Sequence, residues 1–166
     1  FGRFAACADD GENYVSLLRE FREAMPAGRT LSVAVGASPA RLADMNVRDM
    51  ACYLDWMGLM TYDFHGGWEA QTGFQSPLRR GENRGEAEGL SIVESVDNFM
   101  AAGLPASKVV TGAAFYGRGW GNAVQQAPGG AAQGLMPIPP SEQTGNVTDP
   151  NGVIVGRWEA GIWDYR

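Results

Sequence analysis

The order of apolar runs along the chain constrains its fold more than any other feature. Helical and extended patterns alternate. The expected helices cover Asp9–Met25, Asn46–Asp55 and Ser91–Ala102, and the expected strands cover Thr30–Ala37, Trp56–Tyr62 and Lys108–Gly117. The strand runs are continuously apolar, which is typical of parallel strands that are covered on both faces by helices. The order therefore predicts an α/β fold built on a parallel sheet.

Local signals support the three helices. The first has apolar side chains at the i, i+3, i+4, i+7 spacing of one helix face, at Tyr14, Leu17, Leu18 and Phe21. Asn46 is a plausible N-cap of the second helix. Ser91 and Glu94 have the S-x-x-E spacing of a capping box at the start of the third, and Gly103 is placed to end it.

The length of the chain limits how much of such a fold it can form. A closed eight-stranded α/β barrel takes about 250 residues, whereas this sequence has 166. If the fold is a barrel, we expect the chain to be a segment of it. From Gly121 to Gly156 the pattern changes, because five of the nine prolines lie there among many glycines. We expect a surface insertion in this part, with short antiparallel strands.

Composition disfavours several classes of partner. The net charge is −6, so neither nucleic acid nor an anionic membrane is an expected partner. The longest apolar runs are shorter than the roughly 18 residues of a membrane span. Cys7 and Cys52 lack metal-ligand spacing, and they are compatible with a disulfide or with two free thiols. With His65 as the only histidine, we expect no metal site.

Aromatic, hydroxyl and charged side chains gather after the second and third expected strands. They are Tyr62, Asp63, Trp68, Tyr116, Arg118 and Trp120. Because the carboxyl ends of parallel strands share one edge of a sheet, these side chains are expected to converge. Indole faces stack on the C–H face of a sugar, and carboxylates, phenols and guanidinium groups bond its hydroxyls. The pattern favours a sugar-binding cleft; the alternative is that the aromatics fill the core.

Carboxylate spacing leaves one acid–base pair open. Asp55 and Asp63 would lie roughly 26 Å apart along an extended strand, which is too far for a catalytic pair. Asp63 with Glu69 could approach across the loop. His65 is expected to be a loop residue bonded to backbone or solvent.

Three stretches carry a resemblance to a known family. "MTYDFHGGWE", residues 60–69, resembles the Met-x-Tyr-Asp motif and following loop of glycoside hydrolase family 18, the chitinases. "GAAFYGRGW", residues 112–120, resembles the motif on that family's next strand. "WEAGIWDYR", residues 158–166, resembles a stretch near the end of the small insertion region in bacterial members. The resemblance covers nearly all of the chain, in the family's usual order.

The resemblance implies a fold and a division of the chain. Residues 1–120 would form part of a (β/α)8 TIM barrel, about strands 5–7 of the catalytic domain. Residues 121–166 would begin an α+β insertion after strand 7. The implied partners are chitin or chitooligosaccharides, with no cofactor, and the full-length enzyme would be secreted and monomeric.

The resemblance also implies a role for each site residue. The implied catalytic residues are Tyr62 and Asp63, and the implied substrate-binding residues are Met60, Trp68, Tyr116 and Arg118. In this family the substrate's own N-acetyl oxygen attacks the anomeric carbon, so the enzyme must hold that group and protonate the leaving oxygen. Tyr62 would bond the acetamido carbonyl, and Asp63 would bind a sugar flanking the scissile bond. Trp68 would stack on the leaving-group side.

The sequence departs from the family at the catalytic acid. The hallmark Asp-x-x-Asp-x-Asp-x-Glu segment, whose last residue is the acid, does not occur in it. The family's order would put that segment upstream of Phe1. A chitin-binding lectin of the same fold, with its acid replaced, is therefore the alternative to a hydrolase. A structural segment that folds alone is disfavoured, because its cut edges would leave apolar strands unpaired.

Overall fold

The computed structural model describes residues 7–81, 89–121, 123–124, 128–132, 146–148, 154–157 and 159–164. The chain forms two compact units. The first consists of Phe1–Thr61 and Val93–Gly112, and the second of Tyr62–Ile92 and Ala113–Arg166. Trp158 and most of the expected insertion, including residues 133–145, lie outside the described residues.

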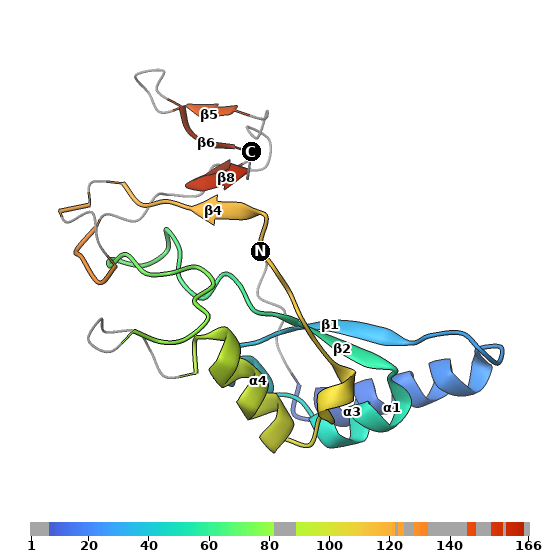
Figure 1. Ribbon diagram of the computed structural model, residues 1–166. Helices are drawn as coiled ribbons and strands as arrows, with labels where there is room; N and C mark the ends of the chain where they lie inside the picture. Colours follow the sequence, from blue (N-terminus) through green and yellow to red (C-terminus); the bar gives the residue numbers. More distant parts are fainter. Residues whose placement is uncertain are drawn as a thin grey trace. The chain divides into compact units, whose positions relative to one another are not determined.

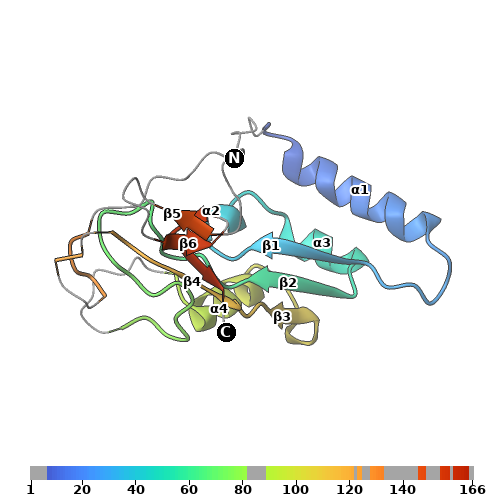
Figure 2. The same ribbon diagram turned by 90° about the horizontal axis from the view of Figure 1, so that it is seen from above.

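A three-stranded parallel sheet forms the centre of the first unit. Its strands are β1 (Ser32–Gly36), β2 (Trp56–Met60) and β3 (Val109–Thr111), in the spatial order β1-β2-β3. Figure 2 shows the three strands side by side. Val35 pairs with Leu59, which in turn pairs with Thr111. The predicted parallel α/β arrangement is confirmed for this part of the chain.

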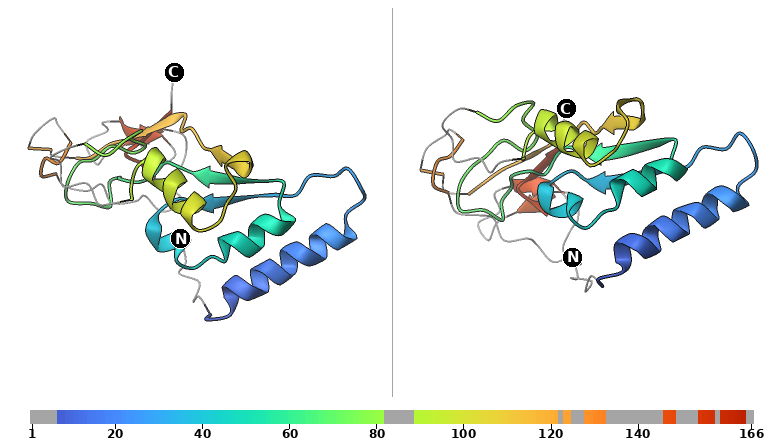
Figure 3. Two further views of the ribbon diagram at one scale, coloured as in Figure 1. Left: turned by 60° about the horizontal axis from the view of Figure 1, so that its bottom comes forward. Right: turned by 90° about the horizontal axis from the view of Figure 1, so that it is seen from below.

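Helices cover one side of this sheet. They are α1 (Asp10–Ala24), α3 (Val47–Tyr53) and α4 (Ile92–Ala101), and Figure 1 shows all three on the same side of β1 and β2. The helix α1 (blue in Figure 3) packs beside α3. The side chains of Met57, Leu59 and Phe99 are at most 1% exposed, so the core lies between the sheet and the helices. Our expectation of helices on both faces is not met in the described residues.

Helix ends in the first unit are fixed by backbone geometry and by distant side chains. Gly103 ends α4 with φ of +107°, a conformation that favours glycine, and Leu104 N donates to Phe99 O. Asn46 is the N-cap of α3 as predicted, but its side chain makes no capping hydrogen bond. The other end of α3 is held by Lys108, whose Nζ donates to the carbonyl oxygens of Ala51 and Leu54 at 2.8 and 2.7 Å.

The second unit contains long loops and short antiparallel strands. Strand β4 (Tyr116–Arg118) pairs with β8 (Ile162–Asp164). Strands β5 (Asn146–Thr148), β6 (Ile154–Arg157) and β7 (Glu159–Ala160) form a second antiparallel sheet. The prediction of short antiparallel strands in the proline-rich part is therefore confirmed. The loop that begins at Tyr62 is braced where Gln71 bridges to Ala131 and Thr72 N donates to Gly130 O.

One expected strand was wrong, and two short helical elements were not predicted. The run Lys108–Gly117 is two strands, because β3 pairs with β2 in the parallel sheet and β4 pairs with β8 in another. Gly112 N still donates to Leu59 O, but residues 113–115 belong to no strand. The apolar run continues across the break, so composition does not reveal the change of partner. A short helix, α2 (Pro39–Leu42), and a 3-10 turn, Ala106–Lys108, were not predicted.

Both cysteines are free and exposed, which resolves the alternative left open by their spacing. In the part of the chain that the structure describes, no helix has the length and apolar character needed to cross a membrane.

Candidate functional site

Asp63 lies three residues after β2, near the start of the loop that also carries Tyr62 and Trp68. Among the described residues other than glycine, it is the one with a positive φ, at 59°. Aspartate tolerates this left-handed conformation better than most residues, though still at a cost. Such a conformation turns the chain sharply at the point where the polar loop begins.

Two donors from β4 converge on one oxygen of Asp63. The Tyr116 hydroxyl donates to Oδ1 at 2.6 Å, and Arg118 Nε donates to the same atom at 2.7 Å. Tyr116 and Arg118 are two residues apart on a strand, so their side chains point to the same face. The strand geometry of β4 thus explains why both reach one carboxylate.

This environment keeps Asp63 ionised. Partial burial raises the pKa of Asp63, but the hydrogen bonds from Arg118 and Tyr116 and the positive charge of Arg118 outweigh that effect, and the pKa lies below its ordinary value of 3.8. Burial, followed by the hydrogen bond to Asp63 and its negative charge, raises the pKa of Tyr116. Tyr116 is therefore a neutral donor to a charged acceptor.

Tyr62 stands beside this cluster. Its ring meets that of Tyr116 edge to face, with centroids 6.1 Å apart and planes at 76°. Gln75 Nε2 donates to the backbone oxygen of Tyr116 at 2.9 Å, which anchors β4 to the loop. Among the described residues, no hydrogen bond to the Tyr62 hydroxyl is found.

Trp68 is the most exposed aromatic of the predicted set, at 58%. The guanidinium carbon of Arg118 lies 4.8 Å from the centre of its ring and 5.7 Å from that of Tyr116. Arg118 also donates to Asp63. Its guanidinium group therefore contacts the Asp63 carboxylate and the rings of Trp68 and Tyr116 at the same time. The side chain of Arg118 is 13% exposed and that of Asp63 35%, so the charge pair is partly shielded from water.

His65 and Glu69 form a second polar pair in the same loop. His65 Nδ1 lies 3.1 and 3.0 Å from the two carboxylate oxygens of Glu69, and Gly66 N donates to Glu69 Oε2 at 3.2 Å. The expectation that His65 bonds backbone or solvent is wrong, since its partner is a carboxylate. Glu69 contacts His65 and Gly66, whereas Asp63 contacts Tyr116 and Arg118. None of these hydrogen bonds connects the Asp63 carboxylate with the Glu69 carboxylate.

The structure links five of the predicted residues within one unit. They are Tyr62, Asp63, Trp68, Tyr116 and Arg118. Met60 belongs to the first unit, where it ends β2 and pairs with Gly36. Trp120 has a buried indole nitrogen that finds no partner in the described part of the chain. Gln75 was not predicted as part of the site. It belongs to no recognised motif, and its side chain binds the backbone oxygen of Tyr116, a contact that no sequence pattern indicates.

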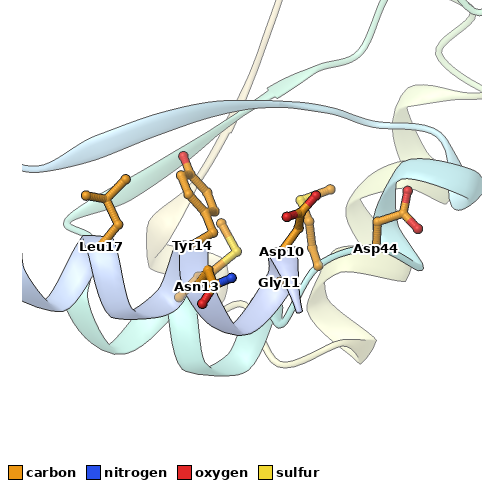
Figure 4. Close-up of a pocket in the computed structure, with 8 residues that line it drawn as sticks. Asp10, Gly11, Asn13, Tyr14, Leu17 and Asp44 are labelled. Carbon is orange, nitrogen blue, oxygen red and sulfur yellow. The ribbon is translucent and has the colours of Figure 1, made fainter. Parts of the chain in front are cut away.

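A hollow of about 440 Å³ in the first unit is not part of this cluster. It lies between α1 and residues 44–50, and Figure 4 shows Tyr14 and Leu17 projecting from one side of α1. The exposed surface of its lining is mainly apolar, and none of the predicted site residues belongs to it. No group of three or more potential metal ligands occurs among the residues described.

Comparison with known proteins gives consistent results. The model of the glycosyl hydrolases family 18 matches residues 3–166. Chitinase A1 of Niallia circulans is 31% identical over 95% of this chain and 22% of its own length. The structure of chitinase ChiA74 from Bacillus thuringiensis matches 97% of this chain and 26% of that one, with 27% identity and a TM-score of 0.78.

An Ostrinia furnacalis Group IV chitinase in complex with allosamidin matches 99% of this chain and 42% of its own, with 30% identity and a TM-score of 0.77. The chain thus spans less than half the length of each of these three relatives. Such neighbours indicate an α/β fold of the TIM-barrel type.

Proposed function

The chain belongs to glycosyl hydrolase family 18, and we propose that the protein carrying it hydrolyses β-1,4-linked N-acetylglucosamine polymers with retention of configuration. The observation that carries the proposal is the cluster around Asp63, where Tyr62, Tyr116 and Arg118 meet. Chitin or chitooligosaccharides would be the substrate, because chitinases are the relatives that match almost the whole chain.

In the proposed mechanism the substrate's acetamido oxygen attacks the anomeric carbon, and the enzyme holds that group in place. The hydroxyl of Tyr62 would donate to the acetamido carbonyl. A donor aimed at developing charge in a dry site is worth about 3 kcal/mol. Asp63 would bind sugar through Oδ2, because the donors from Tyr116 and Arg118 use Oδ1.

The remaining predicted residues would shape the sugar subsites. Trp68, with its exposed indole, would stack on the sugar on the leaving-group side. Tyr116 and Arg118 would line the non-reducing side while holding Asp63. Met60 would pack beneath the reacting sugar. No cofactor takes part in these steps.

The proton for the leaving oxygen would come from a glutamate that is not in this sequence. The hallmark acidic segment is absent from the 166 residues, and we place it upstream of Phe1, on the strand that precedes α1. In this arrangement β1, β2 and the Lys108–Gly117 run correspond to about strands 5–7 of the barrel. Residues 1–120 would be barrel and residues 121–166 the start of the insertion. A secreted, monomeric enzyme fits a polymeric substrate outside the cell.

The test is turnover of soluble chitooligosaccharides by the complete protein and by Tyr62→Phe. Removal of one hydroxyl should lower kcat about 10² to 10³-fold, while Tyr14→Phe on α1, the matched control, should leave it unchanged. Equal turnover by the wild type and Tyr62→Phe would contradict the assigned role. Binding of chitooligosaccharides without any turnover would instead identify a lectin of the same fold.

A further inference from the structure

Hydrogen bonds between Gly66 and Glu69 connect the two ends of the loop segment that contains Trp68. Glu69 N donates to Gly66 O at 3.0 Å, so residues 66–69 form a tight turn with Trp68 in its third position. The side chain of Glu69 returns to the same place, because its Oε2 accepts from Gly66 N at 3.2 Å. Glu69 therefore binds the carbonyl of Gly66 through its backbone amide and the amide of Gly66 through its side chain. We call His65, Gly66 and Glu69 the loop clasp.

The imidazole of the loop clasp is a buried anchor. His65 is 8% exposed, and its Nδ1 bonds the Glu69 carboxylate at 3.0 Å. Its ring packs directly on Gly73, where a Cβ atom would lie 2.4 Å from His65 Cγ. The neighbouring amide, Phe64 N, donates to Gln75 O at 3.0 Å. The carboxylate of Glu69 is therefore held in position by its contact with the buried imidazole of His65.

Trp68 rests on the clasp itself. A Cβ atom on Gly66 would lie 2.2 Å from one carbon of the indole and 2.4 Å from the next, so the ring occupies the space that the glycine leaves empty. Arg118 approaches the ring at 4.8 Å. The indole is nevertheless 58% exposed. An exposed aromatic side chain binds better when its orientation is set before the ligand arrives, because less rotamer entropy is lost.

We propose that His65 and Glu69 are positioning residues that hold Trp68 as a preorganised stacking platform for a sugar. They do not touch the reacting atoms; they act by fixing the turn on which the indole rests. This inference rests on the proposed function, since the platform serves a saccharide ligand. The competing interpretation is that the pair only stabilises the fold of the loop.

The first test is kinetic and uses the complete protein with soluble chitooligosaccharides. Glu69→Ala, His65→Ala and Trp68→Ala should each raise KM about tenfold and leave kcat within about twofold, since stacking contributes mainly to binding. His65→Asn keeps a side-chain N–H near the position of Nδ1 and should restore most of the affinity. Glu20→Ala, which removes an exposed carboxylate on α1, is the matched control.

A double-mutant cycle separates positioning from general stabilisation. If the clasp acts through the indole, Trp68→Ala with Glu69→Ala should bind no worse than Trp68→Ala alone. Gly66→Ala, which displaces the indole without removing the carboxylate, should also raise KM. Additive losses in the double variant, or an unchanged KM in Glu69→Ala, would overturn the inference while leaving the proposed hydrolase intact.

A spectroscopic readout keeps the inference testable apart from activity. In protein labelled with 5-fluorotryptophan, the ¹⁹F resonance of Trp68 is identified by its loss in Trp68→Phe. The resonance should shift or broaden in Glu69→Ala and recover in His65→Asn compared with His65→Ala. An unperturbed resonance in Glu69→Ala would overturn the positioning role. A wild type that neither binds nor cleaves chitooligosaccharides would overturn the proposed function and, with it, the platform.

Discussion

At the scale of single residues, Asp63 has the most specialised surroundings in the described chain. It combines a left-handed backbone with two short hydrogen bonds to one oxygen. The pKa of Asp63 is lowered in the folded protein, which means that the fold stabilises the ionised Asp63 carboxylate more than the unfolded chain does. The same interactions that would prepare it for a sugar therefore also make the stability of the fold depend on pH.

Asp63→Asn should show this dependence. Because the pKa in the folded state lies below 3.8, the ion pair stabilises the fold fully above that pH and loses its contribution as the pH falls through the folded-state pKa. At pH 7 the variant should be less stable by on the order of 1 kcal/mol, since the carboxylate is partly exposed. Chemical denaturation of both proteins from pH 7 down to pH 2 measures the difference. A gap that stays constant over this range would contradict the assignment.

At the scale of secondary structure, the three longer helices and the parallel sheet were predictable, and the division of Lys108–Gly117 between two sheets was not. The expected helices differ from α1, α3 and α4 by at most two residues at any end, because periodicity and Gly103 mark them locally. The split of Lys108–Gly117 depends on which strand lies beside it, which no local pattern encodes. Likewise the convergence of Asp63 with β4 followed from the strand ends, whereas the shared oxygen and the His65–Glu69 pair depend on loop geometry.

The short helix α3 offers a test of how distant residues hold an element. Helices of seven residues are marginal without tertiary support, and α3 ends where Lys108 donates to two of its terminal carbonyls. Lys108→Met should remove both charged hydrogen bonds and destabilise the protein by about 1–3 kcal/mol. Thermal unfolding measures this loss, and Arg19→Met on the exposed face of α1 is the control. Equal melting temperatures for the two variants would refute the capping role.

At the scale of the whole chain, the parallel sheet of the first unit ends in two edges. β1 and β3 are the outer strands, and Val110 on β3 is 49% exposed. Edges of this kind pair readily with other strands, and natural proteins cover or charge them. A family member of the TIM-barrel type would cover them with its neighbouring strands.

The 166-residue chain expressed by itself should therefore self-associate. Light scattering across a concentration series should show species larger than a monomer. Val110→Lys places a charge on the edge strand β3 and should shift the distribution toward monomer. If the wild-type segment is monomeric at every concentration, the edge strands β1 and β3 do not drive self-association and the prediction is wrong.

Retaining hydrolysis at the Asp63 cluster fixes the anomeric configuration of the first product. The measurement is ¹H NMR of penta-N-acetylchitopentaose during its first minutes with the complete protein, before the new reducing ends mutarotate. Attack by the substrate's own acetamido oxygen predicts that the β-anomer forms first. Initial formation of the α-anomer, or no cleavage at all, would contradict the account.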